Sequence, residues 1–153
     1  MLQERAVVNA LLQRHWTGRT LPIDPFEIAQ KEGLSIHPFF DASGWYKPAE
    51  KIIYFNPTEP PTRQRFTVAH ELGHHFFQHG ERPRDSAAQF SALYFDPIES
   101  QANRFAAELL MPAGSVQLLV VDRGETDIAT LARYFDVSEV AMKIRLKNLG
   151  YLA

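Results

Sequence analysis

The chain has 153 residues, of which 45% are hydrophobic and 22% charged, a length and balance typical of one globular domain. Its 16 Lys and Arg residues against 18 Asp and Glu residues give a formal net charge of −2, which excludes the strongly basic composition of many nucleic-acid-binding domains. There is no cysteine, so disulfides, thiolate nucleophiles and Cys-ligated metal sites are excluded, and any metal site must use histidine and carboxylate ligands.

The N-terminal third of the chain predicts two helices followed by a small sheet. Apolar residues recur at helical spacing in MLQERAVVNALLQRHW, which indicates an amphipathic first helix. Asp24 and Pro25 form a helix start, and Gly33 is a natural stop for that second, short helix. Three strands are then expected within residues 34–56, namely LSIHPFF, WY and KIIYFN.

The remainder of the chain predicts helices only. A proline-rich run over residues 57–61 ends the sheet pattern, and a long helix follows with Thr62 as its cap and Gly80 just beyond its end. Residues 81–95 are expected to form a polar, irregular loop, which either covers a site or runs over the surface. Asp96 opens a further helix that reaches about Leu110, and residues 125–150 predict two short helices separated by residues 136–138.

This order of elements indicates an α+β fold, in which a small mixed or antiparallel sheet packs on the long helix and the C-terminal tail resembles a helix-turn-helix. We expect a single domain over residues 1–153, with a catalytic core of residues 1–124 and a helical subregion of residues 125–153. No stretch approaches the about 18 consecutive apolar residues of a membrane span. Polar residues also interrupt the first 16 positions, unlike a secretory signal. The protein is therefore expected in the cytoplasm, without a membrane partner.

The most informative segment is FTVAHELGHHFFQHG, residues 66–80, because it contains an HExxH motif on a predicted helix. His70 and His74 are four residues apart, so both imidazoles lie on one helical face and can bind one metal ion. Glu71 lies about 100° around the helix, beside the ligand pair, where its carboxylate can accept a proton from water held by the metal. The alternative is a merely structural helix, but burying two histidines and a glutamate without a partner would be costly.

A third metal ligand must come from elsewhere in the chain. In metzincins it is a histidine six residues after the second, but here that position is Gly80. On an extended helical wheel His79 and His75 point away from His70. Both are therefore expected to be surface or packing histidines, as are His15 and His37.

Glu99, in IESQANRFAAELLMP, is the better candidate for the third ligand. Asn103 follows it by four residues, shares its helical face and is well placed to orient a ligand. Glu99 also occupies the third helical position, so a purely capping role is the alternative. Glu108 points away from Glu99 on the helical wheel and is expected to face solvent.

The runs RQRFTVAHELGHHFFQH and ESQANRFAAELLMP, in this order and spacing, resemble the ImmA/IrrE family of zinc metallopeptidases. The resemblance extends to LPIDPFEIAQKEGLSI, to SGWY before KIIYFN and through the helical tail. It implies a gluzincin-type site with one zinc ion bound by His70, His74 and Glu99, and with Glu71 as the catalytic carboxylate. It also implies that the substrate is a helix-turn-helix transcriptional repressor.

The predicted activity is zinc-dependent hydrolysis of a peptide bond, with Glu71 as general base. An extended substrate is expected to pair with the edge of the sheet nearest the metal helix, and residues 52–56 are predicted to form that edge. No second oxyanion donor is identified, and Tyr54 and Tyr94 are interpreted as packing aromatics that could reach the site.

The tail DIATLARYFDVSEVAMKIRLKNLGYL leaves other functions to consider. Its acidic and basic residues balance, so direct binding to DNA is not expected. Its apolar residues are expected to pack against the catalytic core or a protein partner: Leu131, Tyr134, Val140, Ile144 and Leu149. Two alternatives to the peptidase therefore remain: a non-catalytic, metal-containing module that binds a repressor, and a DNA-binding regulator that uses the tail.

Overall fold

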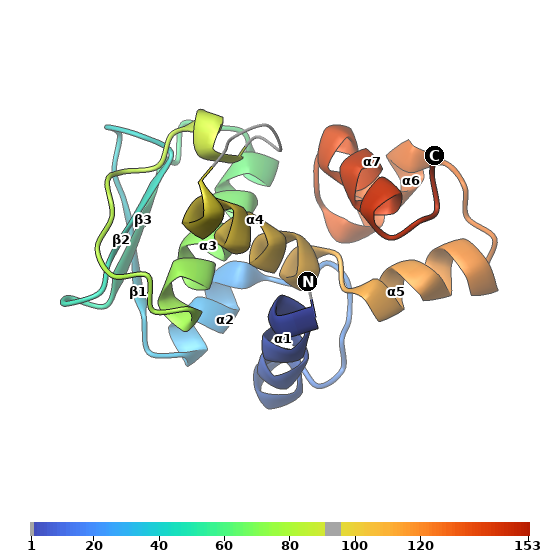
Figure 1. The fold of residues 1–153 in the computed structure, drawn as a ribbon, viewed down its shortest axis with the longest axis horizontal. Coiled ribbons are helices and arrows are strands. Elements are labelled where there is room, and N and C mark those ends of the chain that lie inside the picture. The colour runs from blue at the N-terminus through green and yellow to red at the C-terminus, as the bar shows by residue number, and fades with distance from the viewer. Residues whose placement is uncertain (1, 91–95) are drawn as a thin grey trace.

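The computed structural model of the chain describes residues 2–90 and 96–153 (Figure 1). A three-stranded sheet lies at one end, helices α3 and α4 cross in the middle, and a helical C-terminal unit lies at the other end. In chain order the elements are α1 (Leu2–His15), α2 (Pro25–Lys31), β1 (Ser35–Pro38), β2 (Gly44–Lys47), β3 (Ile52–Phe55), α3 (Pro61–Phe76), η1 (Ala87–Phe90), α4 (Pro97–Leu110), α5 (Ala113–Gln117), η2 (Leu118–Asp122), α6 (Ile128–Phe135) and α7 (Glu139–Asn148). The predicted α+β class is confirmed.

The sheet has the strand order β1-β3-β2. β1 pairs with β3 in parallel, with Ser35 opposite Ile52, and β2 pairs with β3 antiparallel, with Gly44 opposite Phe55. The expectation that residues 52–56 form the edge strand is therefore wrong. β3 leads directly into α3, but both of its sides are paired, so the edges of the sheet are β1 and β2.

Helices α3 and α4 form the centre of the molecule, packed against each other at close range. Gly73 permits this approach, since a Cβ atom there would lie 3.2 Å from the Cα of Ala102 and 3.2 Å from the Cβ of Phe105. The hydrophobic core around the two helices contains buried side chains from other helices and from the sheet as well. It includes Leu12, Ile28, Ile53, Leu72, Phe105, Leu109 and Phe135. The crossing therefore fixes the distance between residues carried by α3 and residues carried by α4.

The helix starts follow local chemistry closely. The side chain of Asp24 accepts a hydrogen bond from the backbone N–H of Phe26 at the start of α2, and Asp96 caps α4 in the same way. The N-cap of α3 is Pro60, two residues before the predicted cap Thr62, and the helix begins at Pro61 because this proline supplies a helical φ angle. The segment 113–122, which carries no strong helix-start signal, is nevertheless helical in α5 and η2.

The C-terminal helices pack only partly as predicted. Leu131 is buried and Leu149 is half-buried, whereas Tyr134, Val140 and Ile144 are exposed, with 71% of Val140 accessible. Helix α7 packs on the core through Met142 and Leu146. A polar side chain adds to this contact, since the Nε of Arg145 donates to the carbonyl oxygen of Met111 at 3.0 Å.

Glu108 was expected to face solvent, but it is buried and 2% exposed. Its carboxylate accepts hydrogen bonds from Arg5 of α1 at 2.9 Å and pairs with Arg145 of α7 at 3.0 Å. As the helical wheel predicts, Glu108 lies on the side of α4 away from Glu99. That side is also covered, by Arg5 of α1 and Arg145 of α7.

No single helix among residues 2–90 and 96–153 is both long and apolar enough to cross a membrane. α4 and the segment Ala113–Asp122 reach the length and apolar composition of a membrane span only when they are taken together, and the pair is bent by 50°.

Candidate metal centre

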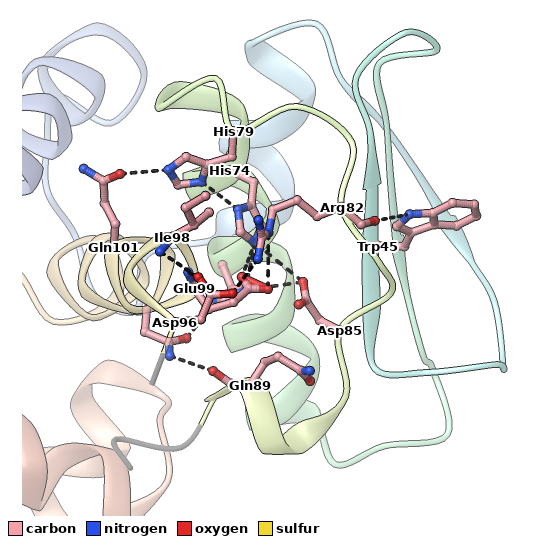
Figure 2. A network of polar contacts seen from close by, with 12 residues as sticks. Trp45, His74, His79, Arg82, Asp85, Gln89, Asp96, Ile98, Glu99 and Gln101 are labelled. Atoms are coloured by element: carbon pink, nitrogen blue, oxygen red, sulfur yellow. Dashed lines mark hydrogen bonds and ion pairs between the residues drawn. The ribbon is translucent and has the colours of Figure 1, made fainter. Parts of the chain in front are cut away.

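His70 and His74 face each other from successive turns of α3. Their Nε2 atoms lie 3.1 Å apart, and both side chains are buried. Glu99, on the first turn of α4, completes the group: its Oε2 lies 2.7 Å from the Nε2 of His74 and 3.4 Å from the Nε2 of His70. The carboxylate of Glu99 is thus directed at the histidines, and Figure 2 shows it beside His74. The crossing of α3 and α4 brings the three predicted ligands together.

Asn103 lies one turn further along α4 and holds His70 in place. The Nδ1 of His70 lies 2.8 Å from the Oδ1 of Asn103, so Nδ1 carries the proton and donates it. The amide nitrogen of Asn103 donates in turn to the carbonyl oxygen of Gln89 at 2.8 Å. This arrangement leaves the lone pair of the His70 Nε2 directed toward Glu99 and His74, as metal binding requires.

His79 was expected to point away from the site, but it contacts His74 (Figure 2). The Nδ1 atoms of the two rings lie 2.7 Å apart, and the Nε2 of His79 lies 2.8 Å from the Oε1 of Gln101. The helical wheel does not apply here, because α3 ends at Phe76 and Gln78 adopts a left-handed conformation with φ of 52°. A chain of hydrogen bonds from Gln101 through His79 therefore fixes the tautomer of His74.

Asp85, in the loop between α3 and α4, is a site residue that the sequence interpretation missed. Its Oδ2 lies 3.3 Å from the Nε2 of His70 and 3.7 Å from the Nε2 of His74, and it is 3% exposed. One nitrogen or oxygen atom from each of His70, His74, Asp85 and Glu99 lies within 4.8 Å of the others. A search of the sequence for ligand-type side chains between the two motifs would have included Asp85. Its distance along the chain from His70 and Glu99 does not show, however, that its side chain points toward them.

Glu71 lies beside this group rather than in it. Its side chain is buried, and Gly44 of β2 gives it space, because a Cβ atom at residue 44 would lie 2.7 Å from the Oε2 of Glu71. Burial raises the pKa of Glu71 well above its usual value, and the carboxylates of Asp85 and Glu99 raise it further. A cation held by these two carboxylates would offset the repulsion that disfavours the ionised form.

The electrostatics of the group favour a positive charge at its centre. Burial alone would lower the pKa of His70, but its interactions with Asp85 and Glu99 outweigh burial and raise it. Burial alone would raise the pKa of Asp85, whereas hydrogen bonds from His70 and His74 hold it far below its usual value. Two imidazole nitrogens and two carboxylates, buried and convergent, are a donor set that fits a divalent ion such as zinc.

The other sequence candidates lie outside the group. Tyr54 stacks on Trp45 in the sheet, and Tyr94 lies outside the described residues. His75 packs as expected, with its Nδ1 2.6 Å from the hydroxyl oxygen of Tyr46. His37 is exposed and His15 pairs with Glu32.

The sequence of the chain is similar to those of known metallopeptidases. Residues 26–147 match the Peptidase_M78 family, described as the IrrE N-terminal-like domain. The chain is 35% identical over 116 residues to the radiation response metalloprotease IrrE of Deinococcus deserti, covering 69% of this chain and 39% of the relative. It is 28% identical over 99 residues to the metallopeptidase ImmA of Bacillus subtilis, covering 65% of this chain and 57% of the relative.

Among solved structures, a Mycobacterium tuberculosis transcriptional regulator superimposes with a TM-score of 0.68 at 16% identity, covering 96% of this chain and 47% of that chain. At this identity the likeness concerns the fold alone. In each of these three comparisons the chain spans less than two thirds of the other protein's length.

Proposed function

The chain belongs to the IrrE N-terminal-like family of metallopeptidases, and from this premise we propose that it is a zinc-dependent endopeptidase that cleaves a helix-turn-helix transcriptional repressor. The observation that carries the proposal is the convergence of His70, His74 and Glu99. Beside them lies Glu71, a buried glutamate that is not part of the ligand group. A purely structural metal site would have no use for that glutamate.

The proposed roles follow from the positions of the side chains. His70, His74 and Glu99 would hold the ion, with Asn103 and His79 orienting the two imidazoles. Zinc, when bound, activates a water molecule and polarises the scissile carbonyl, so that hydrolysis proceeds at neutral pH.

Glu71 lies beside the ligand group without belonging to it, so its carboxylate is free to move a proton. It would accept a proton from the attacking water and pass it to the nitrogen of the departing amine. Its burial supports this role, because a carboxylate with a raised pKa exchanges protons closer to neutral pH.

The choice of substrate rests on the resemblance of the two motif segments to the ImmA/IrrE family. This resemblance implies that the substrate is a helix-turn-helix repressor. Because such a repressor acts on DNA inside the cell, the proposal places the protein in the cytoplasm. We further propose that residues 1–124 carry out the chemistry and that residues 125–153 are a helical subregion of the same single domain.

The test is to incubate the zinc-loaded protein with a candidate helix-turn-helix repressor from the same organism, and to identify the products by mass spectrometry. We expect cleavage at one peptide bond by the wild type and by the surface control Glu50→Gln, and none by Glu71→Gln, which should retain its zinc. Cleavage by zinc-loaded Glu71→Gln at the wild-type rate would remove Glu71 from the mechanism. A repressor that is neither cleaved nor bound would remove the proposed substrate.

One observation favours a second function, that of a non-catalytic, metal-containing module that binds the repressor. With Asp85 included, the group offers four protein ligands, the closed set that is typical of structural zinc sites. If this function is correct, wild type and Glu71→Gln will bind the repressor equally tightly and neither will cleave it.

A further inference from the structure

Asp85 is positioned by its backbone as well as by its carboxylate. Its N–H donates to the carbonyl oxygen of Gly44 at 2.8 Å, and its own carbonyl oxygen accepts from the N–H groups of Ser43 and Gly44 at 2.9 and 3.1 Å. These bonds form an antiparallel bridge on the outer side of β2, the side that does not pair with β3. Asp85 thus forms a single bridge to the sheet edge beside the metal centre.

The residues just before Asp85 are fixed to the same strand and to α4. The carbonyl oxygen of Arg82 accepts from the indole N–H of Trp45 at 3.0 Å, and the guanidinium of Arg82 pairs with Asp96 at 2.7 Å (Figure 2). The guanidinium of Arg84 lies over the ring of Trp45, 5.2 Å from its centre. Residues 82–85 therefore lie against β2, with the side chain of Asp85 directed into the metal centre.

A peptide substrate would need both the outer edge of β2 and a free coordination position on the metal. Extended peptides bind to sheet edges through backbone hydrogen bonds, and the outer side of β2 is the edge that adjoins Glu71 through Gly44. Catalytic zinc sites use three protein ligands and keep one position for water or substrate, whereas four protein ligands close the site. Asp85 contacts both histidines, so its carboxylate lies where a fourth ligand of the metal would lie.

We propose that residues 82–85 are an autoinhibitory strand, in which Asp85 is a fourth protein ligand of the metal and the backbone occupies the substrate position on β2. This inference rests on the proposed function, because it assigns the described conformation to the latent form of that peptidase. Displacement of the strand frees one coordination position and the edge of β2 together. A substrate then reaches the metal only by competing with residues 82–85.

Cobalt substitution tests the inference through the metal itself. The full chain is loaded with Co²⁺ and titrated with acetohydroxamate, a small metal-binding probe, while the visible absorption bands are followed. We expect Asp85→Ala to bind the probe at least about tenfold more tightly than the wild type and to hold the metal at least about tenfold more weakly in competition with a chelator. Asp122→Ala, which removes an exposed aspartate, is the matched control and should behave as the wild type.

The outcomes separate the two proposals. Equal probe binding and equal metal affinity in Asp85→Ala and wild type would overturn the inference and leave the metallopeptidase intact. Failure of the wild type to bind one equivalent of Co²⁺ would overturn the metal centre and the inference with it. Asp85→Asn retains the size of the side chain, so it provides the same comparison if Asp85→Ala does not fold. In the repressor assay, Asp85→Ala is expected to cleave faster than the wild type.

Discussion

Gly44→Ala is expected to damage the protein at the contact between β2 and α3. A Cβ atom at residue 44 would lie 2.4 Å from the Cγ2 of Thr67 and 2.7 Å from the Oε2 of Glu71. Both of these side chains are buried, and Thr67 is β-branched and stiff. The new methyl group therefore cannot be accommodated unless the strand, the threonine or the carboxylate of Glu71 moves.

The size of the effect follows from these distances. Ordinary carbon contacts lie at about 3.5 Å or more, so Thr67 and the new methyl group must separate by roughly 1 Å. Overpacking of this kind costs about 1–3 kcal/mol, which lowers Tm by about 2–12 °C for a chain of this length. If Glu71 gives way instead, a displacement near 1 Å lowers kcat by about 10²-fold.

The assay combines thermal unfolding, zinc content and repressor cleavage. Gly114→Ala is the matched control, because a Cβ atom there meets nothing within 4 Å and Gly114 lies in a helix. Gly44→Ala should retain zinc, because the atoms nearest the new methyl group belong to Thr67 and Glu71 and not to His70, His74 or Glu99. A Gly44→Ala protein as stable and as active as Gly114→Ala would refute the close packing of Gly44 against Glu71.

The other predictions concern the metal centre and one surface ion pair. Glu99→Ala should bind zinc much more weakly; full zinc stoichiometry after dialysis, measured by elemental analysis, would reject Glu99 as a ligand. His79→Ala should lower zinc affinity by about 10–100-fold because His74 loses its orienting partner, and an affinity equal to that of the exposed control His37→Ala would contradict this. Zinc at about a thousand times its Kd should stabilise the protein by about 4 kcal/mol and raise Tm by about 8–16 °C, a shift that excess chelator reverses; an unchanged Tm would contradict a buried metal site. Burial alone would raise the pKa of Glu32, but hydrogen bonds from Arg14 and His15 hold it below its usual value. This ion pair should therefore stabilise the protein at neutral pH and be lost as the pH falls through the lowered pKa, so Glu32→Gln should show a shallower loss of stability in acid than the wild type.

The parts of the site that were predictable are those carried by helices with clear starts. The register of His70 and His74 follows from helical spacing, and the start of α4 at Pro97 follows from Asp96 as its cap. With both helices placed, the sequence also predicts that Glu99 is the acidic residue that faces the histidines. Its role as a metal ligand stays a prediction.

The parts that were missed depend on where a helix ends and where a loop returns. His79 reaches His74 because α3 stops at Phe76 and the chain reverses, and no periodicity continues through such a turn. Asp85 is fixed by a bridge to Gly44, about 40 residues earlier in the chain, and pairing over such a distance leaves no local pattern.

Side-chain burial was the least predictable feature because it depends on what covers each helix. Glu108 lies on the face of α4 opposite Glu99, but Arg5 and Arg145 cover that face and pair with it. Val140 and Ile144 are apolar and yet exposed, because α7 turns other residues toward the core, among them Met142 and Leu146. An amphipathic pattern indicates that a helix has a buried face without showing which layers pack on its other sides.

The central claim is that two imidazoles from α3 and one carboxylate from α4 bind a single divalent ion. A crystal structure of the zinc-soaked protein, with anomalous data collected at the zinc edge, tests it most directly. We expect one anomalous peak within about 2.0–2.2 Å of the Nε2 atoms of His70 and His74 and of a carboxylate oxygen of Glu99. A peak elsewhere, or a Glu99 side chain directed away from the two histidines, would contradict the account.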